Sequence, residues 1–118
     1  MEMEDQPEAV CRALNYGARF IPGESLVKLG GLEAHEDKLQ EIESMLLAAC
    51  GTSYYAAQYA EYLMRELEIF TYVEAKLASE IEESQLSELK AGCFLSVSQS
   101  GETMDLLIPF RLASKHGL

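Results

Sequence analysis

The fold is decided by two stretches of similar pattern, MLLAACGTS at residues 45–53 and CFLSVSQSGET at residues 93–103. In each stretch an apolar run ends in a loop of Gly, Ser and Thr, and an amphipathic run follows at once. This pattern predicts a buried strand, a tight loop and the first turn of a helix. Free backbone N–H groups and the helix dipole point into such a corner, so it favours an anion.

Equivalent positions of the two corners lie about 48 residues apart, for example Ala49 and Val97. That spacing fits neighbouring strands of one parallel sheet, whose carboxyl ends open on a single crevice. Ser98, Ser100 and Thr103 can surround the oxygens of a phosphate with hydroxyl groups. We therefore expect a sugar-phosphate site in this crevice. Neither loop contains Lys or Arg, so binding should be moderate and reversible.

The alternative interpretation of these hydroxyls is structural, because Ser and Thr are favoured N-caps of helices. A lone Ser or Thr at a strand–helix corner is more often a cap. Three hydroxyls and a Gly within six residues, facing a second such corner, favour a ligand instead. No GxxxxGK[ST] loop is present and no GxGxxG follows a strand, so nucleotide binding has little support.

Length and composition exclude several classes of protein. The chain has 118 residues, enough for one domain, and 48% of them are hydrophobic. A formal charge of −11 disfavours nucleic acid, whose phosphates would repel it. No apolar run is long enough for a membrane span, and no signal peptide opens the chain. Three cysteines without metal-ligand spacing indicate a reduced, cytoplasmic context. No cofactor and no metal are expected.

Helical and strand periodicities alternate along the chain, which predicts an α/β fold with a parallel sheet. Pro7 suits the first turn of a helix that could reach Phe20, and a turn follows at residues 22–25. Further helices are expected at 33–44, 52–68 and 103–116, with strands at 45–50, 70–74 and 92–98, and a helix with a loop at 76–89. Only about three strands are visible, and Leu118 stands where a fourth would begin. The chain is therefore expected to be cut inside a domain, on its C-terminal side.

Other residues are weaker candidates for chemistry. Glu102 suits capping more than proton abstraction, because a helix N-terminus stabilises its carboxylate. Cys50 is interpreted as a small core residue at a strand end. His35 and His116 are isolated in the sequence and are interpreted as surface or cap residues. Core and interface packing is the default interpretation for four tyrosines of one helix: Tyr54, Tyr55, Tyr59 and Tyr62.

Several sequence motifs, spread over nearly the whole length of the chain, resemble those of one enzyme family. ACGTSY at 49–54 and SQSGET at 98–103 are similar to the paired signatures of glutamine–fructose-6-phosphate aminotransferases (isomerizing), also called glucosamine-6-phosphate synthases. EMEDQP at 2–7, LGGL at 29–32 and ASE at 78–80 resemble further segments of that family. The resemblance is to the first sugar isomerase (SIS) domain of the isomerase half.

The resemblance implies a fold and a ligand. SIS domains are αβα sandwiches with a five-stranded parallel sheet, and residues 33–118 would be the N-terminal part of one, after an N-terminal helix and connecting segment at 1–32. The ligand would be fructose 6-phosphate or glucosamine 6-phosphate. The residues implied to bind its phosphate are Ser53, Ser98, Gln99, Ser100 and Thr103, with Thr52 beside them.

The same resemblance implies that catalytic groups lie elsewhere. The family releases ammonia in a separate glutaminase domain, and its isomerase base, His and Lys belong to a second SIS domain and a C-terminal tail. This segment alone is therefore expected to be inactive, and to work with those domains in a homodimer. The alternative, from another class, is a non-catalytic SIS module that senses a phosphosugar. The chain departs from the family pattern in about two extra residues between Glu74 and Ala78, in the acidic Glu82-Glu83, and in Pro109.

Overall fold

A computed structural model describes residues 2–23 and 27–118 of the chain. The chain folds as two compact units, Met1–Gln40 and Glu41–Leu118. Both corners identified in the sequence belong to the second unit. The domain boundary expected between residues 32 and 33 stays a prediction.

The first unit contains α1 (Glu2–Ala13), the short 3-10 helices η1 (Asn15–Gly17) and η2 (Glu33–His35), and α2 (Glu36–Gln40). A single antiparallel bridge joins Phe20 to Val27. The turn expected at 22–25 extends outside the described residues.

Three sequence expectations for this part of the chain are wrong. Pro7 lies inside α1 and not in its first turn, because the helix already begins at Glu2. The same helix stops at Ala13, well before Phe20, since Asn15 and Tyr16 take positive φ angles of 49° and 50°. The helix expected at 33–44 ends at Gln40, and Ser44 already belongs to a strand.

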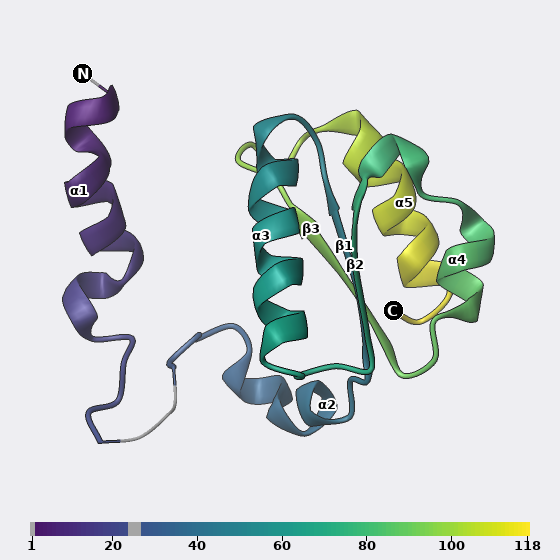
Figure 1. Ribbon diagram of the computed structural model, residues 1–118, viewed down its shortest axis with the longest axis horizontal. Coiled ribbons are helices and arrows are strands. Elements are labelled where there is room, and N and C mark those ends of the chain that lie inside the picture. The colour runs from purple at the N-terminus through teal and green to yellow at the C-terminus, as the bar shows by residue number, and fades with distance from the viewer. Residues whose placement is uncertain (1, 24–26) are drawn as a thin grey trace. The chain divides into compact units, whose positions relative to one another are not determined.

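The second unit is built on a parallel sheet of β1 (Ser44–Ala49), β2 (Tyr72–Leu77) and β3 (Gly92–Val97), in the order β2-β1-β3. Three α-helices accompany it: α3 (Thr52–Glu66), α4 (Glu83–Glu88) and α5 (Met104–Lys115). The short 3-10 helix η3 (Ala78–Glu80) follows β2. In Figure 1, α3 lies on one side of the sheet, and α4 and α5 lie on the other. The expected αβα arrangement is confirmed.

The central strand β1 divides the apolar core into two layers, because its successive side chains point to opposite faces. Leu47 packs on the α3 side with Ala57 and Val73. Leu46 packs on the other side with Leu86 of α4 and Leu106 of α5. Burial on both faces explains why β1 is a continuous apolar run and not an alternating one.

Two expectations about the second unit need correction. The strand expected at 70–74 begins at Tyr72 and continues to Leu77, so Lys76 is in β2 and not in a helix. The helix at 52–68 exists but ends at Glu66, and its buried line is different from the expected one. The helical spacing of the sequence predicts a buried stripe of Ala56, Ala60, Leu63, Met64 and Leu67. In the structure Ala57 is buried instead, and Leu63 and Leu67 are exposed.

The last helix, α5, contains Pro109, which is buried. Proline has no N–H, so it cannot donate to the carbonyl of Asp105 as a helical residue would; the kink expected there stays a prediction. Gly117 follows the C-cap His116 and has a φ of 79°. This left-handed conformation is typical of the residue that ends a helix, as the sequence predicted.

Candidate functional site

The two corners singled out in the sequence lie side by side in the structure. β1 and β3 pair in parallel, and Ala49 is the register partner of Val97. Each strand therefore ends at the same level of the sheet, and each is followed by a loop and a helix, α3 or α5. The prediction of two neighbouring parallel strands that open on one crevice is confirmed. In open α/β sheets this carboxyl end is the usual place for a ligand.

A small hollow of about 120 Å³ lies at this place, and we call it the β1/β3 hollow. Its lining is mostly polar and comes from both corners: Cys50, Ser53, Val97, Ser98, Gln99, Ser100, Thr103 and Leu106. Ligand pockets for whole small molecules are typically about 300–1,000 Å³. The β1/β3 hollow therefore fits one small group, with the rest of a ligand outside it.

Five of the six residues expected at the site line the β1/β3 hollow, and Thr52 does not. Thr52 is the first residue of α3 and is exposed. Three residues that the sequence did not assign to the site also line the hollow: Cys50, Val97 and Leu106. The signal that could have found Cys50 and Val97 is their position next to the loops. Leu106 lies one helical turn beyond Thr103, so it reaches the same hollow.

The serine loop is held by its own hydroxyl oxygens. The N–H of Gly101 donates to Ser98 Oγ at 3.0 Å, and the N–H of Glu102 donates to Ser100 Oγ at 3.2 Å. Ser98 Oγ and Thr103 Oγ1 lie 3.4 Å apart, where either can donate. Two of these hydroxyls therefore shape the loop, but none of them makes the helix-capping hydrogen bond that the structural interpretation expects.

The same bonds leave hydrogens available for a ligand. A hydroxyl has one hydrogen and two acceptor lone pairs. Ser100 accepts a bond within the loop, so its hydrogen is free to point elsewhere. Ser98 and Thr103 share one contact, which uses the hydrogen of only one of them. At least two hydroxyl hydrogens around the β1/β3 hollow can therefore be donated to an anion.

Neither helix that begins at the hollow is capped by a side chain. Gly51 is the N-cap of α3 and Thr103 is the N-cap of α5, and neither makes a side-chain cap hydrogen bond. The first N–H groups of a helix have no partner inside the helix, and they carry its positive dipole end. The expected role of Glu102 as a cap is wrong, because the N-cap is the next residue.

The lining of the β1/β3 hollow has no charged side chain. Its only titratable group is the thiol of Cys50, which is half-buried and not a fully enclosed core residue. Donors at this place are therefore hydroxyls, the amide of Gln99 and backbone N–H groups. Such a lining can bind and orient an anion, and it offers no carboxylate or imidazole for moving a proton.

A larger hollow lies at the opposite, amino end of the sheet. It has a volume of about 510 Å³ and is lined by residues that include Ser44, Tyr72, Gln85 and the carboxylates of Glu74 and Glu88. Carboxylates repel an anion, so this hollow does not suit the ligand that the loops favour. Tyr72 donates to Glu74 there, and burial together with that bond raises the pKa of Tyr72 to about 12.

The two histidines are not part of either hollow. His116 Nε2 lies 3.2 Å from Glu83 Oε1, on the surface between α5 and α4. His35 is exposed at the end of η2. The interpretation of both as surface residues is confirmed. Among the tyrosines of α3, Tyr54 is half-buried, whereas Tyr55, Tyr59 and Tyr62 are exposed and do not pack in the core.

Comparison with known proteins gives one consistent result. No family model matches the chain. The chain is 32% identical over 116 residues to a probable glutamine–fructose-6-phosphate aminotransferase (isomerizing) of Schizosaccharomyces pombe. It is 34% identical over 116 residues to the enzyme of Chlorobaculum tepidum, and 33% identical over 117 residues to enzyme 1 of Rattus norvegicus. These matches cover 98% of this chain but only 16–18% of the relatives.

A solved structure shows the same likeness. The C-terminal domain of glucosamine-fructose-6-phosphate aminotransferase from Francisella tularensis superposes with a TM-score of 0.74 at 28% identity. The match covers 97% of this chain and 31% of that one.

Fold and comparisons together define the second unit as an α/β unit of the SIS type. The chain is homologous to a segment of the glutamine–fructose-6-phosphate aminotransferases (isomerizing), as its motifs indicated. These relatives are enzymes, and the chain corresponds to less than a fifth of their length. None of the helices in the described part of the chain is long and apolar enough to cross a membrane.

Proposed function

We propose that the β1/β3 hollow binds the phosphate group of a sugar phosphate. The chain would be the sugar-phosphate-binding part of a glutamine–fructose-6-phosphate aminotransferase, which makes glucosamine 6-phosphate from fructose 6-phosphate and glutamine. One observation carries the proposal: hydroxyls from two corners converge on one small hollow, at the start of two helices that lack side-chain caps.

Binding follows from the hydrogen-bond donors that line the hollow. The phosphate oxygens accept hydrogen bonds from the hydroxyls of Ser53, Ser100 and one of the pair Ser98 and Thr103. The dipoles of α3 and α5 favour the negative charge of the phosphate. The amide of Gln99 can donate from the rim. The loop bonds to Gly101 and Glu102 hold two of these hydroxyls in place before the ligand arrives, which lowers the entropy cost of binding.

The sugar ring lies outside the hollow in this proposal, because about 120 Å³ is too little for a hexose phosphate. The lining has no charged side chain that could attract the phosphate, and the formal charge of the whole chain is −11. For both reasons the affinity for phosphate is moderate. A site that exchanges substrate and product benefits from such reversibility. The family resemblance adds the context: a glutaminase domain, a second SIS domain and a homodimer, in the cytoplasm.

Proton transfer must come from groups outside the hollow. Its lining offers no Glu, His or Lys, so this segment alone is expected to form no glucosamine 6-phosphate. The same neutral lining would also serve the alternative function, a non-catalytic SIS module that senses a phosphosugar. Turnover of fructose 6-phosphate by the full-length protein distinguishes the two functions.

The test is a calorimetric titration of the 118-residue chain with fructose 6-phosphate. Hydrogen bonds to a charged group contribute about 1.5–3 kcal/mol each. We therefore expect Ser100→Ala to weaken binding roughly 10- to 150-fold. Thr103→Ala should weaken it less, because Ser98 can still donate to the phosphate. Inorganic phosphate should compete with the sugar phosphate, and fructose without the phosphate should not.

Ser114→Ala is the matched control. Ser114 is an exposed residue of α5, the helix whose N-cap is Thr103, and it does not line the hollow. Its affinity should equal that of the wild type. Unchanged affinity in both Ser100→Ala and Thr103→Ala, with wild-type circular dichroism, would show that the phosphate binds elsewhere.

A further inference from the structure

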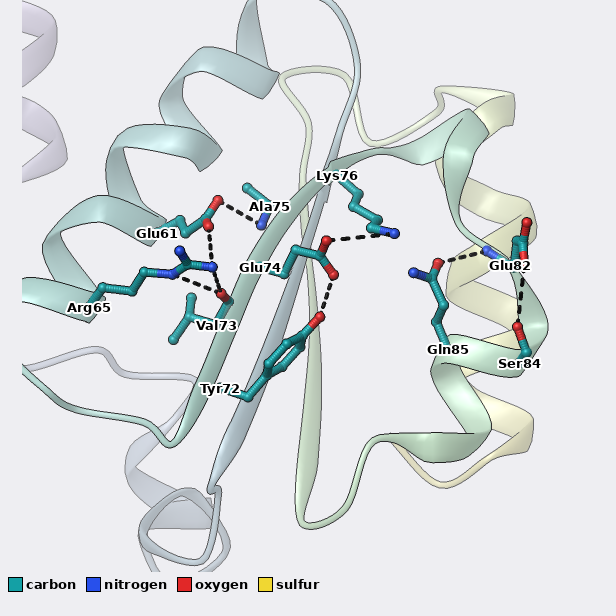
Figure 2. A network of polar contacts seen from close by, with 10 residues as sticks. All are labelled: Glu61, Arg65, Tyr72, Val73, Glu74, Ala75, Lys76, Glu82, Ser84 and Gln85. Atoms are coloured by element: carbon teal, nitrogen blue, oxygen red, sulfur yellow. Dashed lines mark hydrogen bonds and ion pairs between the residues drawn. The ribbon is translucent and has the colours of Figure 1, made fainter.

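The two edges of the sheet differ in the side-chain hydrogen bonds that their backbone groups receive. β2 is one edge strand and β3 is the other. An edge strand presents unpaired backbone N–H and C=O groups, which invite another strand to pair. Figure 2 shows that α3 reaches the outer edge of β2 with two side chains, Glu61 and Arg65.

These side chains bind two backbone groups that β1 does not take. Arg65 donates from Nε and Nη2 to the carbonyl of Val73, at 3.1 and 2.7 Å. The N–H of Ala75 donates to Glu61 Oε2 at 2.9 Å. Arg65 Nη2 also lies 2.7 Å from Glu61 Oε1, so the two side chains hold each other in position.

The pair reproduces what a neighbouring strand would offer. In a parallel ladder, one residue of the incoming strand donates its N–H to the carbonyl of residue i−1 and accepts at its own C=O from the N–H of residue i+1. On β2 these two groups are the carbonyl of Val73 and the N–H of Ala75. Arg65 supplies the donor and Glu61 the acceptor, so the place of that residue is already filled.

The arrangement is specific to β2. No side-chain hydrogen bond reaches the backbone of β3 in the part of the chain that the structure describes. Leu95 in the middle of β3 is 41% exposed, although it lies on the same face of the sheet as buried Leu47. Glu61, in contrast, is only 19% exposed, so its carboxylate lies at the edge and not in solvent.

We propose that the Glu61–Arg65 pair closes the β2 edge of this sheet against strand addition. The pair acts through charge-assisted hydrogen bonds, which are stronger than neutral ones. An incoming strand would have to break both the donor contact and the acceptor contact that the pair makes with the backbone of β2. The proposal rests on the sheet and its edge contacts, and it does not depend on what the β1/β3 hollow binds.

The test uses the 118-residue chain and a probe peptide with the sequence of β2, YVEAKL. The double variant Glu61→Ala/Arg65→Ala should bind this peptide at least about tenfold more tightly than the wild type. A peptide with N-methylated alternate amides cannot form a ladder and should not bind. Amide exchange should show new protection at Val73 and Ala75, and not in β3.

Single variants keep the test decisive if the double variant unfolds. Exchange of the Ala75 amide should be at least about tenfold faster in Glu61→Ala than in the wild type, because its acceptor is gone. Glu61→Gln keeps an acceptor oxygen and should keep the protection. Glu66→Ala is the control, an exposed residue of the same helix away from the edge.

Three results would overturn the proposal. The first is wild-type exchange of the Ala75 amide in Glu61→Ala. The second is a folded double variant that binds the peptide no better than the wild type. The third is peptide binding by the double variant without new protection of the Val73 and Ala75 amides.

Discussion

At the scale of single residues, the corner after β1 depends on Gly51. Its φ and ψ are 55° and −135°, and a Cβ built there would meet nothing within 4 Å. The position therefore needs glycine for its backbone conformation and not for space. This conformation lets the chain turn from β1 into α3 within two residues, Cys50 and Gly51, which places Ser53 at the hollow.

We predict that Gly51→Ala lowers the free energy of unfolding by about 1–3 kcal/mol, the cost of holding an L-residue in a sparsely populated conformation. Chemical denaturation followed by circular dichroism measures it. Gly30→Ala is the control, because a Cβ there also meets open space and no positive φ is required. Equal stability of Gly51→Ala and the wild type would show that the corner does not need glycine.

Tyr72 gives a prediction about alkaline pH. Burial first, and then the bond to Glu74, raise the pKa of Tyr72 from 10.0 to about 12. Between these values the folded chain holds a proton that the unfolded chain has lost, so stability falls as pH rises through this window. Below pH 10 the contribution is fully present.

The measurement is the free energy of unfolding from pH 9 to about 12. It should fall more steeply in the wild type than in Tyr72→Phe, which has no phenol to titrate at this position. Tyr55→Phe is the control, since Tyr55 is exposed on α3 and away from Glu74. Parallel pH profiles of wild type and Tyr72→Phe would contradict the prediction.

At the scale of elements, the sequence predicted what depends on local pattern. The runs that form β1 and β3 could be recognised because their apolar residues stop abruptly at Gly and Ser. The apolar run and the residue that ends it are both local features of the sequence. Their pairing could be predicted as well, since two equal strand–loop–helix units in one chain fit a parallel sheet. The residues around the β1/β3 hollow followed from the same pattern.

Elements whose character is set by tertiary contacts were predicted less well. Glu74 and Lys76 interrupt the apolar residues of β2 with charge, so the sequence pattern predicts that the strand ends at Glu74 and that Lys76 lies in a helix with a loop. In the fold they lie on the α4 side, where they form an ion pair at 3.6 Å and Glu74 accepts from Tyr72. Similarly, the role of Glu61 and Arg65 was invisible because their partners are backbone groups. The extent to which α3 is covered could not be derived from its own periodicity.

At the scale of the whole molecule, the open β3 edge has a measurable consequence. Leu95 on β3 and Phe110 on α5 are both exposed beside an unpaired strand. Exposed apolar residues at a sheet edge favour association. We predict that the isolated chain pairs with a second copy, so that its unfolding midpoint rises with protein concentration by mass action.

Differential scanning calorimetry at several concentrations, with sedimentation, tests this prediction. Leu95→Lys should remove the concentration dependence, because a charge on the edge opposes strand pairing. Leu67→Lys replaces an equally apolar, exposed residue away from β3 and should not remove it. A cooperative transition above roughly 55 °C from a monomer, in the usual range for mesophilic domains, would contradict the prediction.

The register between Ala49 and Val97 has a consequence for how this chain can change in length. Adding or removing one residue in β1 or β3 would slide one loop past the other by about 3.3 Å and turn every later side chain of that strand to the opposite face. The two loops that line the hollow would then lie at different positions along the strand direction. β2 ends at the same level, since Leu77 is the register partner of Ala49, but no residue of β2 lines the hollow. One-residue insertions and deletions should therefore be eliminated from β1 and β3, even where substitutions are accepted in both strands.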